Sequence, residues 1–247
     1  MILYSKELLL NSKGLPSGTV LYSSTTPGQE TSITIPAGVK SIYFELVGGA
    51  GLSYSNSGGA GGKVTGYMKV SKGLVLHLVT AYAWNNNYTP VYNASDLRLP
   101  SLSTNWWEQR IATAGGGGCG ANDSYGGIGG YNATDGGTTH GGKHGTQTAN
   151  GAGGDAGSRD KPGNPGGSYA VGHGGAGITR SSGNNSGAGG AGWYPGGSGG
   201  VKDKWAAVYG YGGGGGASNI NPNYIYDVQY FDGVNTGTGS VIVTVNS

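Results

Sequence analysis

The chain of 247 residues is poor in charge, in phenylalanine and in cysteine. Charged residues make up 11% of it and hydrophobic residues 35%, both low for a globular protein. The single cysteine, Cys119, excludes an intrachain disulfide framework. A net charge of +2 without a clustered basic face does not favour nucleic-acid binding. No apolar run approaches the length of a membrane span, so membrane insertion is not expected.

Residues 1–19 lack a recognisable targeting signal. They have neither the long apolar core nor the small-residue cleavage site of a signal peptide. We therefore expect the protein to be made in the cytoplasm and not to be exported by that route. Two interpretations of this apolar segment stay open: a short element that packs locally, or a docking segment for a larger assembly.

Glycine is the abundant residue. It accounts for 40 of the 102 residues from Gly115 to Gly216, with unbroken runs at 115–118 and 212–216. Between these runs, pairs of glycines followed by one other residue indicate a three-residue repeat, which fits neither the helical period of 3.6 nor the strand period of 2. The polyproline-II helix has three residues per turn and no hydrogen bonds of its own.

A segment of this kind is either a flexible coil or one member of a packed bundle. We predict the bundle, in which each N–H bonds to a carbonyl of a neighbouring segment and close approach requires that no Cβ intervene. Disorder is disfavoured by the low net charge and by the 17 tyrosines and 5 tryptophans. We place 115–118 and 212–216 at the centre of this polyglycine-II bundle.

The sequence outside the glycine-rich region predicts short β-strands. Five segments have strand character: 31–36, 41–47, 64–70, 74–80 and 240–245. We predict that 64–70 and 74–80 form a hairpin through 71–73, and that residues 108–113 return as a strand. The resulting fold is mostly β, without an α-helical core. It is a small β-sandwich of residues 20–114 plus 217–247, into which the 115–216 bundle is inserted. We expect the terminal strand 240–245 to join the N-terminal sheet, so that one sheet clamps the insertion at both ends.

Several candidate motifs do not carry chemistry. The run 187–192 satisfies G-x-G-x-x-G but has no strand before it and no helix after it. His140 and His144 are four residues apart in a segment that cannot sustain a helix, so no zinc site is expected. His77 is flanked by leucines and is interpreted as structural. We expect no catalytic residues, no metal and no cofactor.

The order of motifs resembles the glycine-rich domains of bacteriophage tail-fibre and receptor-binding proteins. The similarity rests on 34–42, 45–51 and 58–66 at its start and on 212–218 and 237–243 at its end. The extracellular glycine-rich domain of anaplastic-lymphoma-kinase-type receptors has a related layout. The resemblance implies a polyglycine-II bundle held by a β-sandwich, whose tip loops touch the bacterial receptor. The aromatic interval 82–107 has no counterpart in that family, and it either covers the sandwich or forms a contact surface.

We therefore expect a tail-fibre or tail-tip adhesin, located in the virion, that binds a host surface glycan or outer-surface protein. Other tail-fibre subunits would bind the N-terminal segment, and a homo-oligomer is possible. The loop 201–211 and the segment 193–195, each flanked by glycine, are expected at one end of the bundle. The candidate receptor-binding residues are Trp193, Tyr194, Lys202, Lys204, Trp205, Tyr209, Tyr211, His140 and His144.

Two other functions remain open. The chain could be a purely structural subunit of a virion fibre or surface appendage, with its aromatic residues in subunit contacts. It could also be an ice-binding protein, because a polyglycine-II bundle can present a flat face. The bulky side chains of Trp193, Tyr194, Trp205, Tyr209 and Tyr211 argue against ice binding, which favours a regular row of small residues.

Overall fold

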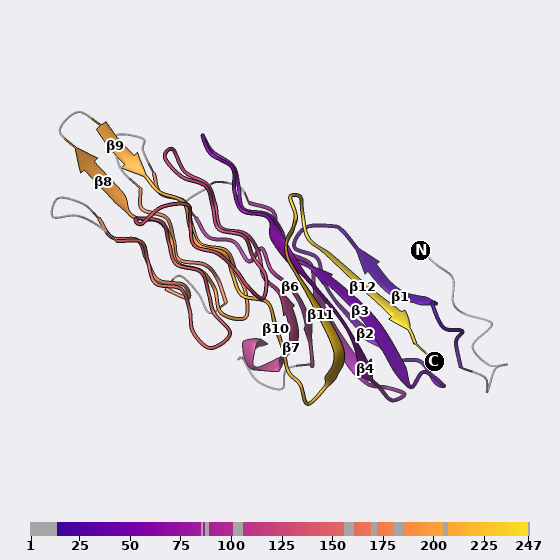
Figure 1. Cartoon of the computed structure of the whole chain (residues 1–247). Coiled ribbons are helices and arrows are strands. Elements are labelled where there is room, and N and C mark those ends of the chain that lie inside the picture. The colour runs from indigo at the N-terminus through magenta and orange to yellow at the C-terminus, as the bar shows by residue number, and fades with distance from the viewer. Residues whose placement is uncertain are drawn as a thin grey trace.

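The computed structural model describes residues 14–84, 86, 89–100, 106–155, 161–168, 172–179, 185–204 and 207–246. Two packed β-sheets lie on one side of the molecule and the glycine-rich region on the other, with a small hairpin at its outer end (Figure 1). The described residues hold one short 3-10 helix, Trp106–Gln109, and no α-helix. The predicted all-β fold without a helical core is confirmed.

Each sheet of the sandwich has five strands, and all pairings are antiparallel. The first sheet has the order β1 (Val20–Ser24), β12 (Ser240–Val245), β3 (Ser41–Val47), β4 (Gly61–Lys69) and β11 (Ile225–Asn235). The second has the order β10 (Asn219–Ile220), β7 (Arg110–Ala114), β6 (Ser95–Arg98), β5 (Val75–Val79) and β2 (Glu30–Thr34). The C-terminal strand lies between β1 and β3, so it joins the N-terminal sheet as expected.

Alternating side chains of the two sheets form the core. On β3, Ile42, Phe44 and Leu46 are buried, and the residues between them are half-buried on the outer face. Leu78 on β5 and Leu97 on β6 belong to the same buried cluster from the opposite sheet. Each such side chain contributes about 1.5–3 kcal/mol when it leaves water. A hydrophobic alternation of period 2 therefore produces two facing apolar surfaces.

The predicted hairpin of 64–70 with 74–80 is wrong. β4 pairs with β3 and β11 in the first sheet, whereas β5 pairs with β2 and β6 in the second. The turn between them crosses the edge of the sandwich, where the Gly73 N–H donates to the Ile35 carbonyl at 2.9 Å. A short turn suits a hairpin and a crossover equally, and only the long-range partners of each strand distinguish the two.

The glycine run 212–216 shows why the sequence repeats every three residues. The N–H groups of Gly213 and Gly216 donate to the segment containing Cys119 and Gly116, at 2.9 Å each. Between them, Gly214 donates to Gly197 and Gly215 to Thr134, in two other segments. Successive N–H groups thus point to three neighbours in turn, as in a helix with three residues per turn.

The carbonyl groups of the run 212–216 accept hydrogen bonds from further neighbouring segments. Gly212 and Gly215 accept hydrogen bonds from Gly142 and Gly145, while Gly213 accepts from Gly127 and Gly214 from Gly190. Neighbouring segments therefore surround the run on all sides, and its predicted central position is confirmed. The run 115–118 is bonded in the same way to segments around it. The lattice also includes two short segments that continue β3 and lead into β4, residues 48–52 and 58–62.

Asn93 takes the place of a glycine segment beside the run 115–118. Its amide nitrogen donates to the carbonyls of Gly49, Ala50 and Gly117 at 2.9–3.3 Å, and its side-chain oxygen accepts from the Ala191 N–H at 2.8 Å. The residue is fully buried. One planar amide thus satisfies backbone groups of three lattice segments.

The chain runs back and forth through the lattice between two ends. Each extended segment from one end to the other is called a pass. Turns at 53–57, 121–125 and 138–141 lie at one end together with the hairpin of β8 (Val201–Lys204) and β9 (Ala207–Gly210), which we call the hairpin end. Turns at 131–132, 146–150 and 193–195 lie at the opposite end. The lattice leaves the second sheet after β7 and returns to it at β10, where Thr113 pairs with Asn219. One sheet holds both ends of the insertion, through β7 and β10 and not through the C-terminal strand.

A side chain at Gly214 has no space. A Cβ there would lie 2.3 Å from the Lys143 carbonyl oxygen, far inside van der Waals contact. We expect Gly214→Ala to destabilise the protein by about 3 kcal/mol or more, lowering the melting temperature by roughly 6 °C or more, because the surrounding backbone cannot yield. Differential scanning calorimetry measures this, and Gly214→Val should be worse.

Gly237→Ala is the matched control, because a Cβ at Gly237 would lie 3.7 Å from its nearest neighbour, an ordinary contact. It should melt within about 2 °C of the wild type, as surface substitutions do. A tolerated Gly214→Ala would show that 212–216 is peripheral.

Candidate functional site

The hairpin end gathers several of the sequence-predicted residues. Lys202 on β8 lies opposite Tyr209 on β9, and Val201 lies opposite Gly210. The Gly200 N–H donates to the His140 carbonyl at 3.0 Å, which joins the base of the hairpin to the 138–141 turn. β8–β9 is therefore held by lattice segments on both sides of its base.

His140, Lys202 and Tyr211 form a cluster at this base, the His140 cluster. The His140 Nδ1 lies 3.3 Å from the Asp155 carbonyl oxygen, which can only accept, so Nδ1 carries the hydrogen. Nε2 is then an acceptor, and Lys202 Nζ lies 3.4 Å from it. The Tyr211 ring packs on the imidazole with a centroid separation of 4.9 Å. The cluster presents one ammonium group beside two aromatic rings.

Neighbouring turns are bonded to one another at the same end. The Asp123 N–H donates to the Gly210 carbonyl at 3.1 Å, and the Gly210 N–H donates to the Asp123 carboxylate at 2.9 Å. Asn56 donates to the carbonyls of Ala121 and Asn122 at 3.2 and 2.6 Å. The 121–125 turn thus joins Asn56 to Gly210, which are 154 positions apart in the chain (210 − 56), in one continuous surface.

Two tyrosines that sequence reasoning did not single out are prominent on this surface. The exposed fraction is 55% for Tyr54 and 61% for Tyr125. Tyr125 lies in the turn 121–125, where a single aromatic residue among polar ones gives no sequence signal of a contact residue. Tyr54 precedes the 115–216 region altogether, and only the inclusion of 48–62 in the lattice brings it here.

Other predicted residues lie elsewhere or outside the described part. Trp205 lies outside the described residues, and for Lys204 only the backbone is described. His144 bonds Asp135, with its Nδ1 2.7 Å from the carboxylate. His140 instead contacts Asp155, Lys202 and Tyr211, so the two histidines have separate partners. Within the described part of the chain, no group of three His, Cys, Asp or Glu residues could hold a metal ion.

Asp135 is a structural acceptor. Burial acts to raise the pKa of its carboxyl, but hydrogen bonds from the His144 backbone and ring and from Lys143 outweigh burial, so the pKa lies below its usual value. The Lys143 Nζ donates to the second carboxylate oxygen at 3.0 Å. This carboxylate ties the 133–137 pass of the lattice to the 142–145 pass.

Trp193 and Tyr194 do not lie with the hairpin, so the expectation that 193–195 and 201–211 share one end is wrong. The Arg110 guanidinium at the start of β7 donates to the carbonyls of Gly192 and Trp193 at 2.9 and 3.1 Å, and it lies 5.1 Å from the Trp193 ring centroid. Residues 196–200 form one complete pass of the lattice, so the turns before and after that pass are at opposite ends.

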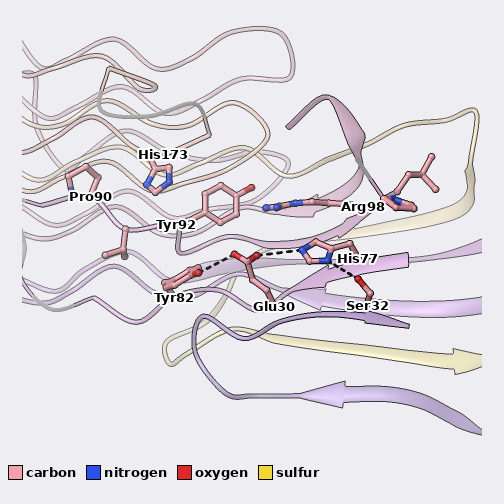
Figure 2. Close-up of a pocket in the computed structure, with 11 residues that line it drawn as sticks. Glu30, Ser32, His77, Tyr82, Pro90, Tyr92, Arg98 and His173 are labelled. Carbon is pink, nitrogen blue, oxygen red and sulfur yellow. Dashed lines mark hydrogen bonds and ion pairs between the residues drawn. The ribbon is translucent and has the colours of Figure 1, made fainter. Parts of the chain in front are cut away.

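His77 lies on the outer face of the second sheet, at the edge of a pocket (Figure 2). Its Nδ1 is 3.1 Å from the Ser32 hydroxyl, and its Nε2 is 3.5 Å from the Glu30 carboxylate. The histidine has partners, as a structural residue would, but it is half-buried and reaches the pocket rather than the leucine core.

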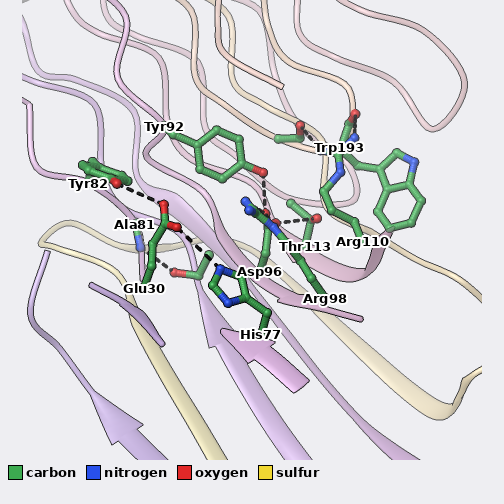
Figure 3. A network of polar contacts seen from close by, with 12 residues as sticks. Glu30, His77, Ala81, Tyr82, Tyr92, Asp96, Arg98, Arg110, Thr113 and Trp193 are labelled. Atoms are coloured by element: carbon green, nitrogen blue, oxygen red, sulfur yellow. Dashed lines mark hydrogen bonds and ion pairs between the residues drawn. The ribbon is translucent and has the colours of Figure 1, made fainter. Parts of the chain in front are cut away.

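A buried polar network lies on the second sheet, next to the bundle (Figure 3). Asp96 is fully buried and accepts from Tyr92 and Thr113, at 2.7 Å each, and from Arg98 Nε at 2.8 Å. Burial, reinforced by the Asp96 charge, raises the pKa of Tyr92, so its hydroxyl stays protonated and donates. The buried carboxylate is thus fully paired, which avoids the cost of an isolated buried charge.

No protein-family model and no curated protein matches the chain. Within the described ranges, no helix has the length and hydrophobicity needed to span a bilayer.

The position of Trp193 changes what its removal should do. We expect Trp193→Ala to destabilise the protein by about 1–3 kcal/mol, because it removes the packing on Arg110 that joins bundle and sheet. Thermal unfolding measures this, and binding to cells below the melting transition should be unaffected. Tyr224→Ala, an exposed tyrosine in the turn after β10, is the control. Unchanged stability with lost cell binding would instead make Trp193 a contact residue.

Proposed function

We propose that the protein is a phage tail-fibre or tail-tip adhesin that binds a host surface molecule through its hairpin end. The observation that carries this proposal is the convergence at one end of turns widely separated in sequence. Each of these turns is held by a lattice whose backbone groups are bonded to neighbouring segments. The resemblance of the glycine-rich segments to those of phage receptor-binding proteins supports the same function.

A rigid lattice suits such a surface. Ordering a loop when it binds costs affinity, and a turn whose two ends are already bonded has little freedom left to lose. Tyrosine supplies a large amphipathic contact area at low conformational cost, and Tyr54 and Tyr125 are exposed at this end. Lys202 adds a cation beside the aromatic rings of the His140 cluster. This combination suits a glycan or an outer-surface protein loop.

Attachment to the virion would use the other side of the molecule. In Figure 1 the paired strands β1 and β12 lie far from the β8–β9 hairpin. The proposed docking segment, residues 1–19, leads into β1. Most of it lies outside the described residues, and the Gly18 N–H at its end donates to the Val245 carbonyl at 2.8 Å. A partner subunit bound near β1 would leave the hairpin end accessible.

The test is binding of fluorescently labelled protein to a panel of bacterial strains. On a strain that binds the wild type, we expect Tyr125→Ala and Tyr54→Ala each to weaken binding roughly tenfold or more, because an aromatic anchor is lost from the contact surface. Their melting temperatures should stay within about 2 °C of the wild type, because both side chains are exposed.

Tyr224→Ala is the matched control, since Tyr224 is 42% exposed and its turn bonds to Ile111 of β7 through Asn221. It should bind as the wild type does. If Tyr224→Ala and the hairpin-end variants weaken binding equally, recognition lies elsewhere on the molecule. A wild type that binds none of the strains but co-assembles with a fibre subunit would favour a purely structural role.

A further inference from the structure

A pocket of about 630 Å³ lies on the outer face of the second sheet, where the sheet meets the glycine bundle. Strands β2, β5 and β6 supply Glu30, His77 and Arg98 to its wall, the loop after β5 supplies Tyr82 and Tyr92, and His173 comes from the bundle (Figure 2). Its volume is within the range of pockets that bind small molecules.

Strand register explains the polar side of this pocket. Ser32 pairs with His77, and His77 pairs with Arg98, so the three side chains form a row across the outer face of the sheet. The bundle covers the neighbouring part of this face through a small apolar cluster that includes Val79, Tyr92 and Ala191. The pocket is the part of the polar face that the bundle leaves open.

Glu30 is the principal acceptor in the pocket. One carboxylate oxygen accepts from the Tyr82 hydroxyl at 3.1 Å, and the other lies 3.5 Å from the His77 Nε2. The Glu30 side chain is 46% exposed. A carboxylate offers about four lone-pair sites, so Glu30 retains the capacity to accept hydrogen bonds from a ligand.

Aromatic rings form the wall next to Glu30 and the inner wall of the pocket. Tyr82 is 40% exposed, and the Tyr92 and His173 rings lie 5.4 Å apart at the inner wall. A glycine fixes the position of Tyr82: a Cβ at Gly28 would lie 2.6 Å from carbons of the Tyr82 ring, and Gly28 has a φ of 67° that favours glycine. The ring is therefore held in place before any ligand arrives.

The charged side chains that line the pocket indicate whether a ligand would be anionic, cationic or neutral. Arg98 is paired with the buried Asp96, so its charge is compensated within the protein. Glu30 disfavours an anionic ligand, and among the lining residues that the structure describes it is the one carboxylate, which is too few for a metal ion. Ring faces beside hydrogen-bond acceptors and donors match a molecule with an apolar C–H face and a rim of hydroxyl groups.

We propose that this pocket is a saccharide-binding site for a neutral pyranose residue. The sugar ring packs on Tyr82, and its hydroxyl groups donate to Glu30 and bond to His77. The site is separate from the hairpin end, because none of its lining residues belongs to the hairpin-end turns. Its existence does not depend on the proposed adhesin function.

The experiment is a ligand-observed NMR titration of the full chain with glucose, galactose and N-acetylglucosamine, and with choline and glutamate as charged probes. We expect saturable binding of at least one sugar, with a Kd of order 1 mM, and no binding of the charged probes. Tyr82→Ala and Glu30→Gln should each weaken that binding roughly tenfold or more. Tyr82→Ala removes the ring face, and Glu30→Gln retains the shape of the acceptor.

Tyr224→Ala is the matched control, a tyrosine of similar exposure (42%, against 40% for Tyr82) in the turn after β10 that should leave sugar binding unchanged. Near-ultraviolet circular dichroism of each variant checks that the fold is retained. The proposal is overturned if no sugar binds, if sugar binding survives both pocket variants, or if choline or glutamate binds in place of the sugars. It is also overturned if Tyr54→Ala alone abolishes sugar binding, because the sugar would then bind at the hairpin end.

Discussion

The structure depends on a requirement of the peptide group: a three-fold extended segment has no hydrogen bonds of its own, so each N–H must find a carbonyl in another segment. In the run 212–216 this requirement is met by neighbours on every side, to which successive residues donate in turn. Such close approach excludes a Cβ, as at Gly215, where one would lie 1.8 Å from the Ile128 carbonyl oxygen. Glycine is therefore a steric necessity at these positions, despite its high conformational entropy in the unfolded chain.

The outermost segments of such a lattice lack a glycine neighbour on one side, so their backbone groups need hydrogen-bonding partners from another part of the protein. The sandwich supplies the boundary. Strands β7 and β10 lead the chain into and out of the bundle, and the run 48–52 continues β3 directly into the lattice. Asn93 then satisfies lattice groups from the sandwich side, where a further glycine segment would otherwise be needed. The loop after β5 thus supplies both Tyr92, which packs between the sheet and the bundle, and Asn93, which bonds to lattice segments.

The same architecture separates two kinds of surface. Turns at the hairpin end present exposed tyrosines that are bonded to the lattice and not to the sandwich core. The junction between bundle and sheet is instead built on a paired, buried carboxylate, Asp96, with an open pocket beside it. In the proposed adhesin the first surface would contact the host and the second would hold a small saccharide.

The local sequence pattern was sufficient to predict those parts of the structure in which residue type alone fixes the conformation. The period-3 glycine repeat, the central position of 212–216 and the C-terminal strand in the N-terminal sheet all followed from the sequence, because Cβ sterics and period-2 burial leave few alternatives. Tertiary structure alone decided which sheet β4 and β5 join, because a turn of three residues serves a hairpin or a crossover. It also decided which turns share an end, because this depends on the number of lattice passes between them. Trp193 is therefore beside Arg110, and Tyr54 is at the hairpin end, since long-range hydrogen bonds, which leave no local trace in the sequence, place them there.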